Sequence, residues 1–257
     1  MIRQLKSIVR DARDEVLEIC LKDCVHYCGF SYDDGYFNPY ANYLRDYHAG
    51  LPLDDIRQRF AFYFEQFLPE DLGEVFQINT AKKYYSWQLP WATHYKEGWF
   101  MNIVEVPDIV SHFSEEGVLR HRIEEECCWL ESAYFNIKRL SYQPKQHTFI
   151  RINSFVDSTG RMKHLLADGN HRVSAMLALG IDKASVRRHP RDLVKETELK
   201  RWPLVRDGIY NSDDAMRIFH AYFDSPRNQP VSKRKNRIID SRGTVLTSDF
   251  SRLRKAG

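Results

Sequence analysis

Five consecutive residues, Asp168-Gly169-Asn170-His171-Arg172, bring a carboxylate, an imidazole and a guanidinium together around one glycine. They follow the apolar stretch "HLLA" and precede a helix-like apolar pattern. When a strand passes through glycine into a helix, the unpaired N–H groups of the first helical turn point beyond the strand end. Those groups and the helix dipole favour an anion, most often phosphate. The sequence therefore predicts a phosphate-binding turn, and a capped turn with surface His and Arg is the plainer alternative.

Each residue type has a defined use in such a turn. Glycine lets the backbone approach a ligand closely, and the arginine fork matches phosphate oxygens. A magnesium ion prefers one or two carboxylates together with phosphate oxygens and water, so Asp168 is the candidate metal ligand. The predicted phosphate-binding residues are Gly169, Asn170, His171, Arg172 and Ser174.

The spacing of apolar residues predicts the helices and strands that would position this turn. Helices are predicted over 2–28, 53–68, 114–140, 173–179 and 212–223, the last capped by Ser212, and strands over 147–156, 161–167 and 183–188. Strands and helices mix without strict alternation, which predicts an α+β fold.

Two further residue groups have a structural and a functional interpretation. Cys20, Cys24 and Cys28 would share one face of the helix over 2–28, where core packing explains them better than zinc, because the spacing matches no usual zinc motif. The aromatic segment 84–100 is either a loop packed over the core or a ring-stacking platform for a sugar or base.

Charge is distributed unevenly along the chain. The net charge is +3, but the residues from 230 to the end carry +6, which leaves −3 for the rest. A mildly acidic body argues against broad nucleic-acid binding, although the basic tail leaves contact with RNA, DNA or acidic lipid open. Neither a membrane span nor a secretory signal is visible, so we expect a cytoplasmic protein without a membrane partner.

The stretch "ADGNHRVSAMLALGI" resembles the phosphate-binding turn of the ParB/sulfiredoxin-like superfamily. The preceding "EECCWLESAYFNIKRLSYQP" is similar to that family's acidic helix, and "RWPLVRDGIYNSDDAMRIF" is similar to an ending found in uncharacterised proteins of polysaccharide gene clusters. The resemblance covers roughly 120–224. It implies a mixed sheet with flanking helices over 101–225, an aromatic-rich helical region over 1–100 and a basic tail over 226–257.

The resemblance also implies a function. Members share a nucleotide phosphate held on this turn, here by Gly169, His171 and Arg172. Asn170 occupies the place of the sulfiredoxin cysteine, so repair of a sulfinic acid is not expected. Too few residues follow the last helix for the DNA-reading module of partition proteins. Phosphoryl transfer from ATP, ADP or CTP, with Mg²⁺, to a small hydroxyl-bearing acceptor such as a sugar remains the favoured interpretation.

Such chemistry needs a carboxylate beside the acceptor hydroxyl. By its place in the acidic helix Glu126 is the first candidate and Glu125 the second, with Asp168 and His171 as further catalytic candidates. Trp129 stands where the family pattern has arginine. A ParB-like nuclease or nucleic-acid binder, and a non-catalytic ligand-binding module, are the alternative functions.

Overall fold

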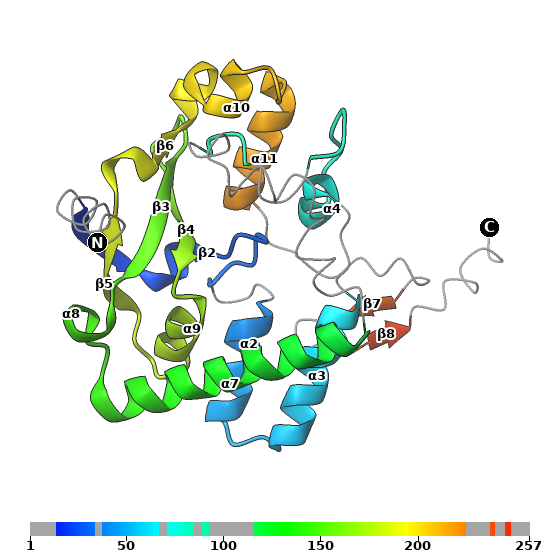
Figure 1. Cartoon of the computed structure of the whole chain (residues 1–257), viewed down its shortest axis with the longest axis vertical. Coiled ribbons are helices and arrows are strands. Elements are labelled where there is room, and N and C mark those ends of the chain that lie inside the picture. Colours follow the sequence, from blue (N-terminus) through cyan, green and yellow to red (C-terminus); the bar gives the residue numbers. More distant parts are fainter. Residues whose placement is uncertain are drawn as a thin grey trace, which may run out of the picture.

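The computed structural model describes residues 14–33, 38–66, 71–84, 89–92, 116–224, 237–239 and 245–247. Six of the described strands form one mixed sheet in the order β1-β5-β3-β4-β2, with β6 pairing with β3 (Figure 1). These strands are β1 (Glu15–Cys20), β2 (Cys24–Val25), β3 (Ile150–Val156), β4 (Met162–Asp168), β5 (Lys183–Arg188) and β6 (Leu193–Lys195). Helices flank the sheet, so the predicted α+β class with a mixed sheet is confirmed.

The described helices flank this sheet (Figure 1). Helix α7 (Glu116–Leu140) runs past α9 (Asn170–Ala178), α2 (Pro39–His48) and α3 (Leu53–Gln66), as Figure 1 shows. The shorter α4 (Leu72–Phe76), α8 (Pro144–His147) and α10 (Pro203–Arg206) lie elsewhere around the sheet, and α11 (Ser212–Asp224) contacts α4. The predicted helices over 53–68, 114–140, 173–179 and 212–223 are therefore confirmed in the parts that the structure describes, although α9 begins three residues early. Residues 67–68 and 114–115 lie outside the described ranges.

The hairpin of β3 and β4 positions the predicted turn, which follows the end of β4. The two strands pair antiparallel, and Asp157 closes their connection by accepting hydrogen bonds from the backbone N–H groups of Thr159 and Arg161, both at 2.9 Å. Strand β4 then ends at Asp168, directly before Gly169. The strand-to-helix transition expected from the sequence is thus present.

The predicted helix over 2–28 is wrong in the part that the structure describes, from residue 14 onward. This segment forms β1, the 3₁₀ turn η1 (Leu21–Asp23) and β2. Spacings of three and four residues suggested a buried helical stripe, but Val16 is 55% exposed and β1 pairs along its whole length with β5. Tertiary pairing outweighs local propensity here. Strands from the predicted N-terminal region therefore join the same sheet as strands from 101–225.

Two smaller predictions are also revised. Cys24 and Cys28 are buried, as core packing requires, but they do not share a helix face. Helix α11 is capped by Asn211 and not by Ser212, since the Asn211 side chain accepts the Asp214 backbone N–H at 2.7 Å. Side chains of this type cap helices because they satisfy an N–H group of the first turn.

The described part of the aromatic segment is a packed loop. Trp91 is buried, with its ring centroid 4.8 Å from that of Phe155 and 5.4 Å from that of Trp202. Tyr84 stacks on Tyr210 with centroids 3.9 Å apart. Trp87 and Trp99 lie outside the described residues.

The tail is described only in the antiparallel pair β7 (Arg237–Ile239) and β8 (Val245–Thr247). Within the described ranges, no helix is both long and apolar enough to cross a bilayer.

Asp214 ties helix α11 to the loop before the aromatic segment. Its carboxylate is buried and accepts hydrogen bonds from the Tyr84 hydroxyl at 2.8 Å, the Ala81 backbone N–H at 2.9 Å and the Asn211 amide at 2.8 Å. Removing such an acceptor leaves buried donors unsatisfied.

We expect Asp214→Ala to lower the free energy of unfolding by about 3 kcal/mol, because several charge-assisted hydrogen bonds are lost together. Urea unfolding followed by circular dichroism measures the change. The matched control is Asp213→Ala, at an exposed position of the same helical turn. Equal losses for the two variants would contradict a tethering role of Asp214.

Candidate functional site

Gly169 forms the joint between strand β4 and helix α9. Its φ is +101°, and a Cβ added there would lie 2.7 Å from Cγ1 of Ile150. Only glycine meets both demands, since other residues are strained at this φ and any side chain would clash with β3. The sequence analysis assigned Gly169 to the close approach of a ligand, whereas its close neighbour in the structure is Ile150, a packing contact within the fold.

No side chain caps the first turn of α9 within the described structure. The N–H groups of a helix start that lack a capping side chain are donors for an external acceptor. Ser174, predicted to bind phosphate, is fully buried, and its hydroxyl donates to the Asn170 carbonyl at 2.9 Å. Asn170 itself accepts the Tyr32 hydroxyl at its side-chain oxygen, at 3.3 Å.

His171 and Glu126, both predicted as catalytic, are in direct contact. The His171 Nε2 and Glu126 Oε2 atoms are 2.6 Å apart, and the Glu126 Oε1 atom accepts Arg122 at 3.0 Å. Glu126 is 9% exposed, so its carboxylate is held by these two partners in a largely dry setting. Helices α7 and α9 thus assemble an Arg122–Glu126–His171 chain.

Aromatic rings surround the imidazole of His171. The Trp129 and Tyr40 ring centroids lie 5.7 and 6.0 Å from it, and the Arg122 guanidinium lies 4.7 Å above the Trp129 ring. Glu125, the second predicted carboxylate, is partly exposed and contacts Arg122 at 3.4 Å. The structure therefore brings Glu126, and not Glu125, to His171.

Arg172 points to the other side of α9. Its guanidinium donates to the Thr148 carbonyl at 2.7 Å and to the Asp168 carboxylate at 3.0 Å. Asp168 has a 60% exposed side chain. Among the described residues, no three His, Cys, Asp or Glu side chains gather as a metal site. A magnesium ion at Asp168 would therefore take its other ligands from phosphate and water, which is a common arrangement for this ion.

His26 belongs to the same neighbourhood, and the sequence analysis did not identify it. Its ring is 2% exposed and stacks on Tyr40 with centroids 5.1 Å apart, while Nδ1 accepts the Cys28 backbone N–H at 3.1 Å. Burial, and then the nearby His171, lowers the pKa of His26 to about 3. No motif marks this histidine, because its position depends on β2 joining the sheet beside β4.

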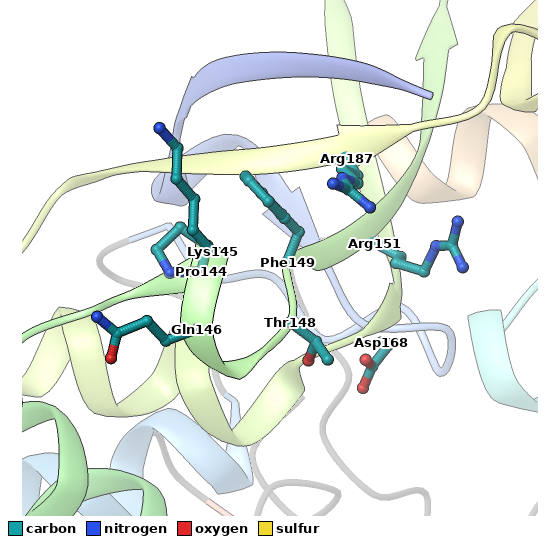
Figure 2. A pocket seen from close by; sticks show the side chains of 8 residues that line it. All are labelled: Pro144, Lys145, Gln146, Thr148, Phe149, Arg151, Asp168 and Arg187. Atoms are coloured by element: carbon teal, nitrogen blue, oxygen red, sulfur yellow. The ribbon is translucent and has the colours of Figure 1, made fainter. Parts of the chain in front are cut away.

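A cavity of about 520 Å³ borders the Arg172 side of the turn, where Asp168 and Thr148 line it (Figure 2). His171 and Glu126 are not among its lining residues. The predicted single site is therefore divided by helix α9 into an imidazole–carboxylate side and a cavity side.

Comparison with known proteins gives no further assignment. No family model, no curated protein and no solved structure matches the chain.

Gly169→Ala should lower the free energy of unfolding by about 3 kcal/mol, since strain at positive φ adds to a clash with Ile150. Gly160→Ala is the control, because Gly160 has φ +85° but nothing within 4 Å of an added Cβ. It should cost only about 1 kcal/mol, from strain alone. Chemical denaturation of both variants measures the difference, and equal costs would show that the contact with Ile150 is unimportant.

His26 should make stability depend on pH. Its folded pKa of about 3 lies below the ordinary 6.5, so below pH 6.5 the unfolded chain takes up the proton first. Stability is then lost at roughly 1.4 kcal/mol per pH unit between these two values. His26→Asn, which keeps an acceptor for Cys28, should flatten this dependence between pH 6.5 and 4 in urea titrations. The exposed His147→Asn should not change it, and parallel curves for all three proteins would refute the prediction.

Proposed function

We propose that this protein is a ParB/sulfiredoxin-like phosphotransfer enzyme that binds ATP, ADP or CTP with Mg²⁺ and phosphorylates a small hydroxyl-bearing molecule. The observation that carries the proposal is the 2.6 Å contact between His171 and Glu126 at the start of helix α9. The proposal combines a candidate proton acceptor with a candidate phosphate-binding helix start.

The phosphate-binding half of the proposal rests on α9. This helix has nine residues and no side-chain cap on its first turn. Its N–H groups and dipole suit phosphate oxygens. Arg172 adds a guanidinium in the first turn of the helix, and Arg122 brings a second one above Trp129. Arg122 thereby supplies positive charge near the position where Trp129 replaces the arginine of the family pattern.

The acid–base half of the proposal rests on which ring nitrogen of His171 faces Glu126. With the Nε2 proton directed at Glu126, the Nδ1 lone pair of His171 is the proton acceptor, and Glu126 stabilises the imidazolium that forms. The acceptor hydroxyl would lose its proton to Nδ1 as its oxygen bonds to the terminal phosphorus. The bond from that phosphorus to the nucleotide oxygen would break, and the shortened nucleotide would leave.

Magnesium, when bound, would neutralise developing charge on the phosphates. Asp168 is the residue that would hold it, at the strand end directly before Gly169. Its exposed carboxylate is accessible for this role.

Glu126→Gln should retain nucleotide binding but lower kcat by about 10² to 10⁴, the usual contribution of acid–base catalysis. The measurement incubates the protein with ATP, ADP or CTP, Mg²⁺ and a metabolite extract, and follows phosphate transfer by mass spectrometry. Glu125→Gln is the matched control, since it removes the same charge one residue away from the His171 contact. Equal activity of the two variants would contradict the role of Glu126 as the partner of the His171 base.

Arg172→Ala should weaken nucleotide binding at least about tenfold in calorimetry, because a charge-assisted contact is lost. The absence of nucleotide binding by the unmodified protein, with or without Mg²⁺, would overturn the proposal. Binding without any transfer would instead support a non-catalytic ligand-binding module.

A further inference from the structure

The cavity beside the turn reaches the first turn of helix α9. Two of its lining residues, Asp168 and Thr148, accept hydrogen bonds from the Arg172 guanidinium. Its other lining residues come from α8, from the segment after it and from strands β3 and β5: Pro144, Lys145, Gln146, Phe149, Arg151 and Arg187. A volume of about 520 Å³ is typical of sites that hold small organic molecules. A ligand in this cavity would therefore lie next to a phosphate bound at the start of α9.

The position of His171 sets the direction in which a nucleotide would lie on α9. In the proposed function the terminal phosphorus must meet the acceptor hydroxyl beside His171, because that hydroxyl gives its proton to the imidazole. His171 contacts α7 and does not line the cavity, whereas Asp168, the proposed magnesium ligand, lines it. The nucleoside is joined to the opposite end of the phosphate chain, so it would extend into the cavity.

The cavity wall contains a planar group suited to a nucleobase. Arg187 lies over the buried Phe149 ring, with its Cζ 4.4 Å from the ring centroid. A guanidinium with one face on a ring directs its other face away from that ring, and such planes stack on nucleobases. Stacking uses the face of the guanidinium and not its N–H groups, so it does not depend on the other partners of Arg187. Pairing of Arg187 with Arg151 on β3 fixes the strand that carries this group.

Gln146 provides a polar group on another side of the same cavity. Figure 2 shows Lys145 and Gln146 on the α8 side, Arg151 and Asp168 on the opposite side, and Phe149 between them. The Gln146 amide offers both a donor and an acceptor. The edge of a nucleobase carries both functions as well, so an amide can pair with it.

We infer that this cavity holds the nucleoside half of the bound nucleotide, with the nucleobase stacked on Arg187 and its edge at Gln146. The inference rests on the proposed function, since it takes the phosphates to lie at the start of α9. It assigns the two sides of α9 to the two substrates. The nucleoside occupies the cavity side, and the phosphate acceptor binds on the side of His171.

Calorimetry on the full chain, with Mg²⁺ and at fixed ionic strength, tests this inference with ATP and inorganic tripolyphosphate as probes. Both contain a triphosphate chain, and tripolyphosphate carries the greater negative charge, so tighter binding of ATP reports the nucleoside. We expect ATP to bind at least about tenfold more tightly, the usual size of one stacking contact. Equal affinities would overturn the inference.

The ratio of the ATP affinity to the tripolyphosphate affinity is the readout for variants. Arg187→Leu removes the stacking plane and should lower this ratio about tenfold. Gln146→Ala, at an exposed position of α8, should lower it about fivefold through loss of a hydrogen bond. Gln146→Ala decides the test if Arg187→Leu does not fold.

Arg201→Leu is the matched control, because it removes the same charge at an exposed position that does not line the cavity. It should change both affinities alike and leave the ratio as in the unmodified protein. An unchanged ratio in Arg187→Leu and Gln146→Ala would mean that the nucleoside lies elsewhere and would overturn the inference. A ratio that falls equally in Arg201→Leu would overturn it as well.

Phosphate transfer, measured on the same proteins, separates this inference from the proposed function. If ATP and tripolyphosphate bind equally and ATP still transfers phosphate, the proposed function stands and this inference fails. If ATP binds more tightly through Arg187 and Gln146 but transfers no phosphate, the nucleoside site stands and the enzymatic function fails. If neither probe binds, both fail.

Discussion

Gly169 packs so closely against Ile150 that an added Cβ would lie 2.7 Å from the isoleucine side chain, and its φ of +101° turns strand β4 directly into helix α9. Because helical residues follow the strand without a linker, successive side chains leave the turn about 100° apart. His171 consequently reaches α7, while Arg172 reaches the segment before β3. The division into an imidazole–carboxylate side and a cavity side follows from this one contact.

The fold was predictable where its signals are local. The run from β3 through β4 and α9 to β5 carries strand-like apolar stretches and glycines at its joints, and the structure has these elements in that order. Strand β1 was not predictable, since Val16 and Ile19 suit a helical spacing as well as a strand. This segment is a strand because it pairs with β5, whose residues lie far along the chain.

The candidate site was predictable to a similar extent. Residue chemistry singled out His171, and the resemblance of the acidic helix singled out Glu126, although the sequence gives no distance between α7 and α9. His26 escaped notice because it is buried without a motif. The pairing of Arg151 with Arg187 also escaped, since β3 and β5 are neighbours in the sheet but not consecutive in the chain. Contacts that depend on strand order cannot be read from spacing.

The two sides of α9 share the ion pair between Arg172 and Asp168. The Asp168 side chain is 60% exposed, and ion pairs of this kind contribute about 1 kcal/mol or less. Arg172 is held more firmly by the Thr148 carbonyl, which it contacts at 2.7 Å. To interact with the Arg172 guanidinium, a phosphate at the start of α9 would therefore need to replace only the weak ion pair with Asp168. On the proposed function, Asp168 would then be available to a metal ion.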